Sequence, residues 1–300
     1  MIKIKVLLLA LGFVICSLVK AEQAHPEKYE YSLKGWNKWK AEYDQTVVGK
    51  GGWLSLAGLY WLTEGANTIG SAKDNHHQFP SKAPKHLGTI LVVEDKVSID
   101  NKTELMQVED SVFKRAELSA KDKTLVTFGD FEFFVLKREI GFAVRLIDND
   151  SENIKSFEGT KFITYDQSWV KPAKLIKHEK PQIIKIPTVY GTVREDTSAG
   201  WLEFEIGGKI QRLQAVDYGK DSLMYVMFSD SSSGDNTYGA GRYIEVEWPD
   251  ENGNTFIDFN RAYNPACAFT NYATCPLTPR QNRLKVTINA GELDVAHKPL

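Results

Sequence analysis

The feature that most constrains the fold is a series of short apolar segments separated by tight turns, without a helical pattern between them. Thr124–Phe128 and Phe131–Arg138 flank Gly129-Asp130, a two-residue turn typical of β-hairpins. Phe142–Asp148 follows and alternates with a period of two. Strands so close in sequence pair antiparallel. The pattern therefore predicts an all-β fold with antiparallel sandwich or barrel-like sheets.

The carboxy-terminal part repeats this pattern with further predicted strands. Their ranges are Gln182–Val189, Gly200–Ile206, Lys209–Ala215, Ser222–Asp230, Phe256–Asn260 and Leu284–Ile288. A connector rich in Lys and Pro, which ends near residue 180, separates the two groups of strands. We therefore predict two β-rich parts, residues 22–180 and residues 181–300.

One amphipathic helix is predicted ahead of the strands, at Glu27–Tyr43. Aromatic and apolar residues recur there at spacings of three and four, with charged residues between them. Gly35 weakens this pattern, because glycine destabilises a helix interior. The helix leads the amino-terminal part of the chain and is expected to pack on it through its apolar face.

The first 21 residues have the composition of a secretory signal peptide. Met1–Lys5 is basic, Val6–Val19 is apolar, and Ala21 ends a short small-residue motif suited to cleavage. The apolar run is short for a membrane span. Lipid attachment at Cys16 is the alternative, although Ile15 departs from the small residue that such processing requires. We predict cleavage near Ala21 and a periplasmic or secreted protein.

Removal of this segment leaves an acidic chain. The full chain has 37 basic and 39 acidic residues, and residues 1–21 hold three lysines and no acid, so 34 remain against 39, a formal charge of −5. No block of basic residues stands out. Nucleic acid is therefore not expected as a partner, since its binding depends on neutralising phosphates. No later stretch is apolar and long enough to span a membrane.

Two cysteines remain after the signal peptide, Cys267 and Cys275. In an exported protein an even pair favours a disulfide. A metal site is the competing interpretation, but two sulfurs alone do not complete one, and no histidine lies near them in sequence. Adjacent His76 and His77 also lack a further local ligand. No metal site is predicted.

Polar residues concentrate after the last predicted hairpin. Alternation places Asp258 and Asn260 on one face of their strand, close to a turn with Tyr263 and Asn264. Such a set suits a small anionic or polyhydroxylated ligand, or else satisfies the backbone of a long loop. The candidate ligand-binding residues are Arg242, Asp258, Asn260, Tyr263, Asn264, Asn282 and Glu292.

A second polar face is predicted on the hairpin of the amino-terminal part. Arg138 and Arg145 lie on its neighbouring strands, and Asp148 ends the second one. A solvated sheet face accounts for these residues better than a site does. The sequence alone assigns them no function.

Two resemblances to known families follow from motifs. Asn67–Ser71, Asn75 and Phe79-Pro80, followed by a hairpin ending at Asp100, resemble a forkhead-associated β-sandwich. That family binds phosphothreonine with an Arg after the Gly and a Ser before a His. Here Ser71 replaces the Arg, and residues 83–86 do not provide the Ser. The resemblance thus implies an architecture and not phosphopeptide binding.

Longer motifs resemble a second family, the bacterial domain-of-unknown-function family 1684. They are GWLSLAGLYWLTEGANTIGS, TYGAGRY, DFNRAYNPACAF, CPLTPRQNRL and INAGE. The resemblance spans nearly all of the chain after residue 21. It implies a β-rich unit and carries no activity, substrate or cofactor.

Two functions stay open from the sequence. The first is an exported protein that binds a small polar or anionic ligand, or a component of the cell envelope, without catalysis. The second is a hydrolase of an envelope or nutrient polymer, with Asp258 and Glu292 as a carboxylate pair or with a bound metal. Common nucleophile, zinc-protease and phosphate-loop motifs are absent, and no cofactor is identified.

Overall fold

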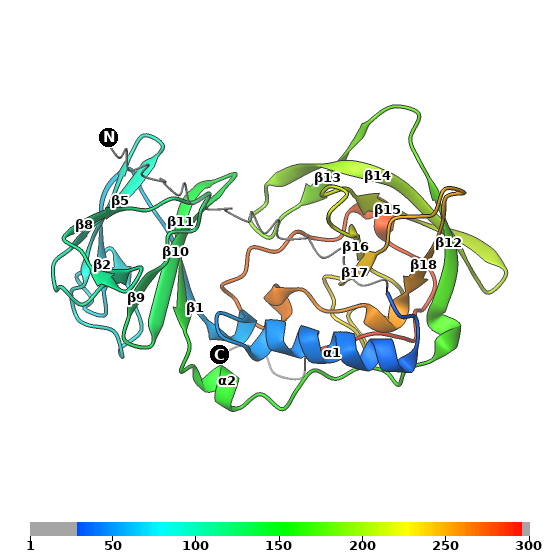
Figure 1. The fold of residues 1–300 in the computed structure, drawn as a ribbon, viewed down its shortest axis with the longest axis horizontal. Helices are drawn as coiled ribbons and strands as arrows, with labels where there is room; N and C mark the ends of the chain where they lie inside the picture. Colours follow the sequence, from blue (N-terminus) through cyan, green and yellow to red (C-terminus); the bar gives the residue numbers. More distant parts are fainter. Residues whose placement is uncertain (1–28, 296–300) are drawn as a thin grey trace, which may run out of the picture.

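The computed structural model describes residues 29–295, so the predicted signal peptide with Cys16 and Ala21 lies outside the described residues. The described residues form three sheets, paired antiparallel except for one short parallel pair, with one long helix near their start. The predicted fold class is confirmed. Figure 1 shows β1 to β11 in one part and β12 to β18 in the other.

The amino-terminal part contains two of the sheets. One has the order β1-β11-β10-β9-β6-β7, with bounds Leu56–Trp61, Gly141–Asp148, Phe131–Arg138, Val126–Phe128, Gln107–Val108 and Ser111–Val112. The other has the order β3-β2-β4-β5-β8, with bounds His77–Gln78, Gly65–Gly70, Gly88–Val93, Lys96–Asn101 and Arg115–Glu117. Both predicted hairpins, β4–β5 and β9–β10, are present.

A hydrophobic core fills the space between these two sheets. Phe133 and Val144 are fully buried in it from the first sheet, and Ile90 and Ile99 from the second. Successive side chains of a strand point to opposite faces of its sheet. The residues that alternate with Phe133 on β10 and with Val144 on β11 therefore face away from this core. The first sheet therefore has a second face, turned toward the carboxy-terminal part.

The third sheet forms the carboxy-terminal part. Its order is β17-β16-β15-β14-β12-β18, with β13 paired to β14, and its bounds are Arg242–Val246, Met224–Phe228, Lys209–Val216, Val193–Ile206, Val170–Ile176, Asn254–Asp258 and Gln182–Pro187. β12 precedes residue 180 and yet lies between β14 and β18 in this sheet. The change of sheet thus falls before β12, in a segment with α2 (Glu152–Lys155) and η2 (Gln167–Trp169).

Helix α1 (Leu33–Val48) begins later than predicted. Ser32 is its N-cap, and the Ser32 side chain accepts a hydrogen bond from the backbone N–H of Gly35. Although α1 precedes the amino-terminal sheets in sequence, it runs along the carboxy-terminal part (Figure 1). Tyr43 and Val47 are buried there against Phe269 and other aromatic side chains.

The last stretch of the described chain is irregular, so the strand predicted at Leu284–Ile288 is wrong. Its backbone bonds to the turn after β16, where Leu284 N–H donates to the carbonyl of Ser229, and Ile288 N–H donates to the Asp230 carboxylate at 2.6 Å. Side-chain acceptors replace part of a strand ladder here. Besides η2, the described chain has four 3₁₀ turns: η1 (Trp53–Ser55), η3 (Phe259–Arg261), η4 (Ala266–Ala268) and η5 (Arg280–Asn282).

Candidate functional site

The seven residues predicted as a ligand site are brought to the carboxy-terminal part, but in separate clusters. Six of them are almost completely buried, and Tyr263 is half-buried: Arg242, Asp258, Asn260, Asn264, Asn282 and Glu292 form the buried set. Each cluster is bonded within the protein.

Arg242 lies at the start of β17 with a fully buried side chain. Its Nη2 is 3.5 Å from Asp230 Oδ1, and its Nη1 donates to the carbonyl of Ala290 at 2.5 Å. Burial lowers the pKa of this guanidinium, while the Asp230 carboxylate opposes that shift. The carboxylate that pairs with Arg242 is thus Asp230, from the turn after β16, and not Asp258 or Glu292.

Asp258 and Asn260 link the end of β18 to neighbouring segments through hydrogen bonds and an ion pair. The Asp258 carboxylate is 3.2 Å from Arg261 Nε and accepts from the Asn260 side chain at 2.9 Å. The Asn260 side chain also exchanges two hydrogen bonds with the backbone of Asp166, each of 3.0 Å. Burial raises the pKa of Asp258, opposed by the bond from Asn260 and the charge of Arg261. Asp258 Oδ2 and Arg261 Nε have no hydrogen-bond partner and meet each other only as an ion pair, so the cluster is held within the protein by opposite charges and by the bonds of Asn260.

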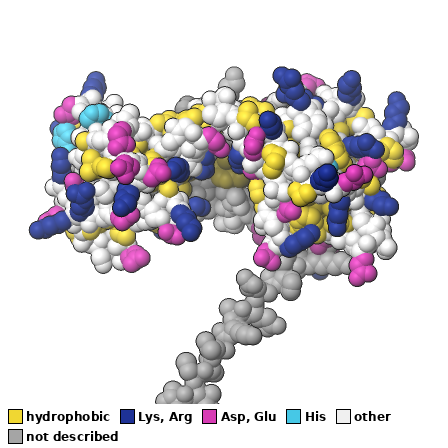
Figure 2. Space-filling view, turned by 90° about the horizontal axis from the view of Figure 1, so that it is seen from above, with side chains coloured by type: hydrophobic (Ala, Val, Ile, Leu, Met, Phe, Trp, Pro, Cys, Tyr) yellow, Lys and Arg dark blue, Asp and Glu magenta, His cyan; other side chains and the backbone are white. Residues whose placement is uncertain are grey.

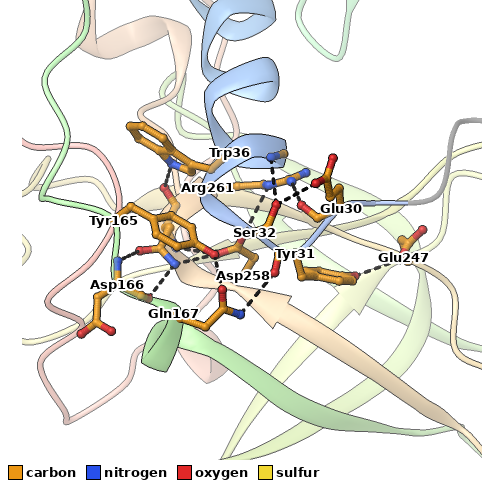
Figure 3. Close-up of polar contacts among 12 residues, drawn as sticks. Glu30, Tyr31, Ser32, Trp36, Tyr165, Asp166, Gln167, Glu247, Asp258 and Arg261 are labelled. Atoms are coloured by element: carbon orange, nitrogen blue, oxygen red, sulfur yellow. Dashed lines mark hydrogen bonds and ion pairs between the residues drawn. The ribbon is translucent and has the colours of Figure 1, made fainter.

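Figure 3 shows that the same cluster holds the segment before α1. Arg261 donates to the carbonyl of Glu30 at 2.7 Å, and Gln167 donates to the carbonyl of Tyr31 at 3.2 Å. Trp36 on the first turn of α1 donates to the backbone of Asn260 at 2.9 Å. These contacts join three distant segments of the sequence, which explains why so many polar residues gather here.

Glu292 forms the third cluster. Its Oε2 accepts from the hydroxyl of Tyr43 at 2.6 Å and from the backbone N–H of Asn264 at 2.7 Å. Burial raises the pKa of Glu292 to about 8, against the lowering effect of these two hydrogen bonds. The Tyr263 hydroxyl turns elsewhere, toward Glu245 at 3.3 Å. Glu292 and Asp258 therefore belong to different clusters, each with its own partners.

Asn282 is a link between β15, β16 and the last 3₁₀ turn. It accepts from the backbone N–H of Gln214 at 2.7 Å and donates to the carbonyls of Gln214 and Met227 at 2.8 and 2.9 Å. Its amide is thus engaged on both sides by buried backbone groups. This fits the interpretation in which the loop residues satisfy the backbone.

The two predicted disulfide cysteines are free thiols in the structure, so the predicted bond is not formed there. They lie close together, because the backbone N–H of Cys267 is 3.1 Å from Cys275 Sγ. Hydrogen bonding from the Cys275 thiol lowers the pKa of Cys267, and the same contact raises the pKa of Cys275. Among the described residues, no group of three or more Cys, His, Asp or Glu side chains could hold a metal ion.

An open pocket of about 300 Å³ lies on the outer face of the first sheet. Below it is called the basic pocket, and it is lined by Ala120, Lys121, Lys123, Phe134, Leu136, Lys137, Arg138 and Arg145. It faces the carboxy-terminal part, since Arg145 and Arg138 both donate to Thr274 Oγ1, at 3.3 and 3.2 Å. Figure 2 shows the molecule as two broad parts with a narrower middle between them.

Strand pairing positions the two arginines of the basic pocket. Arg145 on β11 lies opposite Phe134 on β10, and Arg138 at the end of β10 lies opposite Gly141. Both arginines are on the same face as Leu136, because the side chains of β10 alternate. Asp148 lies on the opposite face of β11 from Arg145 and is ion-paired with Lys82 at 3.6 Å. The sequence placed the arginines on one hairpin, but Asp148 does not join them.

The charges of the basic pocket are poorly compensated. Burial and the neighbouring Arg138 charge both lower the pKa of the Arg145 guanidinium, in that order of importance. Arg145 Nε is buried and has no hydrogen-bond partner. Within residues 29–295, Lys137 is the one cation of this pocket paired to a carboxylate, that of Asp95 at 2.9 Å. The pocket thus offers unpaired donors and positive charge above an apolar floor.

Sequence reasoning did not identify this pocket as a site. Lys121 and Lys123 belong to the loop before β9, and Lys123 has a φ of 53°, which is uncommon for a residue with a side chain. Asp122 between them accepts a hydrogen bond from Ser119 and so turns to its own loop. No spacing rule joins this loop to Arg138, Arg145 and Thr274. The available signal was the pair of arginines on one hairpin face.

The fold and its sites define a β-rich protein of three sheets, with a helix and a long irregular segment packed on the third sheet. Residues 155–293 match the family described as "Protein of unknown function (DUF1684)". The matched range contains four of the five motifs that suggested the family. The first motif, residues 52–71, lies before it. No curated protein matches the chain.

Two solved structures are similar to parts of the chain. One is the solution structure of an uncharacterised protein of Haloarcula marismortui, 29% identical over 48% of this chain and 80% of that chain, with a TM-score of 0.40. The other is a crystal structure of the FhaA FHA domain in a complex, 16% identical over 29% of this chain and 85% of that chain, with a TM-score of 0.22. Among the described residues, no helix is long and apolar enough to cross a membrane.

Proposed function

We propose that this protein is an exported β-protein that binds a small anionic ligand in the basic pocket. The observation that carries the proposal is Arg145, whose guanidinium faces Arg138 without a carboxylate partner and whose buried Nε lacks an acceptor. An anion beside the two guanidinium groups would supply the missing negative charge. It would also relieve the repulsion between Arg138 and Arg145, which lowers the pKa of Arg145.

The second function considered from the sequence, a hydrolase with Asp258 and Glu292 as a carboxylate pair, has less support. Asp258 is ion-paired with Arg261, and Glu292 accepts from Tyr43 and a backbone amide. Their side chains are buried at exposed fractions of 3% and 1%. A polymer chain would need an open cleft between two accessible carboxylates, and the contacts of both residues favour a structural role.

Ligand binding is tested by thermal unfolding of the purified chain with inorganic phosphate, sulfate or acetate at constant ionic strength, because salt screens exposed charges. A ligand at 100 times its Kd stabilises the folded state by about 2.7 kcal/mol. The variant Lys121→Gln/Lys123→Gln should lose much of this response. Lys177→Gln/Lys180→Gln removes the same charge from an exposed loop between β12 and β13 and serves as the control.

The expected result is an anion-dependent stabilisation that the control retains and the pocket variant loses. An equal loss in both variants would mean that the response reports overall charge. The absence of any response in the wild type, for all three anions, would refute a small-anion site in the basic pocket.

Export and disulfide formation are part of the same proposal. The amino-terminal composition supports cleavage after Ala21, and an oxidising compartment would convert the adjacent thiols Cys267 and Cys275 into a disulfide. Mass spectrometry of the protein recovered from the periplasm or medium tests both statements. A chain that begins at Glu22 supports export with cleavage. Two freely alkylated thiols without prior reduction would contradict the disulfide.

A further inference from the structure

We propose that the ligand of the basic pocket is an anionic amphiphile, with one carboxylate or phosphate head and an apolar body. This inference rests on the proposed function and specifies its ligand. The head would lie against Arg145 and Arg138, and the body would lie over Phe134 and Leu136. The pocket combines these two surfaces on one face of β10 and β11.

The position of the head follows from the donors. Arg145 uses Nη2 on Tyr272 and Thr274 of the carboxy-terminal part, at 3.4 and 3.3 Å, which leaves its buried Nε without a partner. Arg138 uses Nε on Thr274 and Nη1 on its neighbouring carbonyl. The loop 272–274 thus fixes both guanidinium groups from the opposite side. Fixed guanidinium groups suit an oxyanion with two or three oxygens.

The position of the body follows from the floor of the pocket. Phe134 and Leu136 lie on the strand that also carries Arg138, and Ala120 closes the side formed by the loop before β9. Lys123 Nζ lies over the Phe134 ring, 6.0 Å from the ring centre, so a positive charge borders the apolar floor. An apolar group placed here would remove the half-buried Phe134 ring from water, while Leu136 beneath is already buried.

The size of the basic pocket argues against a bare inorganic anion. Its volume of about 300 Å³ corresponds to roughly ten water molecules at the volume of liquid water. An anion held at Arg145 would leave most of this space as water against Phe134 and Leu136. A pocket of this size is at the lower end of those that hold small organic ligands. An organic anion therefore fits better than an ion alone.

The positive charge of the basic pocket also determines which classes of ligand it excludes. Lys121, Lys123, Arg138 and Arg145 place positive charge at the rim and at one end, and Asp122 is turned toward Ser119. A cationic amphiphile would meet like charge, and a neutral one would leave the buried donor of Arg145 unpaired. The head group should thus decide whether a ligand binds, and the apolar body should decide how tightly.

Isothermal titration calorimetry of the full chain at constant ionic strength tests this inference with matched ligands. The series is acetate, butyrate, hexanoate and octanoate, then inorganic phosphate against octyl phosphate, with octyltrimethylammonium and octanol as controls for the head. Each methylene that becomes buried should tighten binding about threefold to fourfold, the change that corresponds to about 0.8 kcal/mol. The two controls should bind much more weakly than octanoate.

The matched variants are Phe134→Ala and Phe134→Leu, with folding checked by circular dichroism. Phe134→Ala should weaken the binding of octanoate about tenfold and leave the binding of acetate unchanged. Phe134→Leu should retain most of the difference in affinity between octanoate and acetate. Equal affinities for acetate and octanoate would overturn the amphiphile and leave the anion site intact. Failure of every anion to bind would instead refute the proposed function. Tight binding of octyltrimethylammonium would overturn the role of the arginines.

Discussion

The buried polar clusters and the basic pocket differ in how their charges are compensated. In the buried clusters each charged group lies beside an opposite charge or hydrogen-bond donors: Arg242 has Asp230, Asp258 has Arg261, and Glu292 accepts from two donors. Arg242 Nε and Arg261 Nε lack hydrogen-bond partners there, as Arg145 Nε does in the pocket, so the contrast concerns charge. In the pocket, two arginines share one face without a carboxylate between them.

This difference shows that a high density of polar residues in sequence does not by itself mark a site. The residues from Asp258 to Glu292 are numerous because a long irregular segment has many backbone groups to satisfy. The pocket residues are few and far apart in sequence, yet among the described residues Arg138 and Arg145 have no carboxylate partner. Unpaired charge that a ligand can reach is the better indicator of binding.

The largest expected effect concerns Arg242. Arg242→Met leaves Asp230 buried without its cation, and removal of one partner of a buried ion pair typically costs about 3–5 kcal/mol in the free energy of unfolding. Urea denaturation measures this change. Arg212→Gln, which breaks the exposed pair with Glu203, should cost less than about 1 kcal/mol and is the control.

The same variant also tests the comparison itself. If Arg242 is structural, Arg242→Met should keep the anion-dependent stabilisation of the wild type at a temperature where it is folded. A complete loss of that response in Arg242→Met, together with a normal response in Lys121→Gln/Lys123→Gln, would move the ligand site to the carboxy-terminal cluster.

The next effect is the pH dependence that Glu292 introduces. Burial raises its pKa from 4.5 to about 8, so the folded state binds this proton more tightly than the unfolded state. The contribution to stability is present below pH 4.5 and is lost as pH rises through 8. Over this window we expect a decline of about 2–4 kcal/mol from this group.

Glu292→Gln should remove this decline, because the amide oxygen can still accept from Tyr43 and from the Asn264 amide without carrying a charge. Unfolding free energies of both proteins from pH 4.5 to pH 9 provide the measurement. The variant should be the more stable protein at pH 9. Parallel curves for the two proteins would show that Glu292 does not hold a proton in the folded state.

A smaller effect is expected from the two thiols. If the exported protein carries the Cys267–Cys275 disulfide, its reduction opens a short loop and lowers stability by roughly 2–3 kcal/mol on the chain-entropy model. Thermal unfolding with and without a phosphine reductant measures this change, and Cys267→Ser/Cys275→Ser should show no response to the reductant. An unchanged melting temperature of the wild type would indicate that the thiols are not bridged.

The fold was largely predictable from the sequence, because strand signals are local. The turn at Gly129-Asp130, where Gly129 adopts a φ of 55°, and the alternation in Phe142–Asp148 predicted a hairpin that the structure contains. The strand predicted at Leu284–Ile288 is wrong, because its alternating apolar residues pack an irregular segment onto the core. The N–H of Ile288 donates to the Asp230 side chain and not to a neighbouring strand. Alternation alone does not distinguish the two cases.

The sites were less predictable, because partners come from distant segments. The ion pair of Arg242 with Asp230 and the bond from Tyr43 to Glu292 join residues that no short motif connects. The packing of α1 on the last segment could not be read from its position in the sequence. For the basic pocket, strand parity placed Arg138 and Arg145 together, but the loop with Lys121 and the contact with Thr274 depend on tertiary structure.

The smallest effect on stability, and the sharpest contrast with Arg242, is expected for Arg138. Arg138→Gln removes a like charge that lowers the pKa of Arg145, so the ligand-free protein should be unchanged or slightly more stable, within about 0.5 kcal/mol. Anion binding measured by calorimetry should nevertheless weaken, since one of the two guanidinium groups is lost. Arg115→Gln, an exposed arginine paired with Asp100 at 3.7 Å, is the matched control and should bind as the wild type does. A marked loss of stability with unchanged anion affinity would place Arg138 among the structural residues, and the contrast between the two regions would not hold.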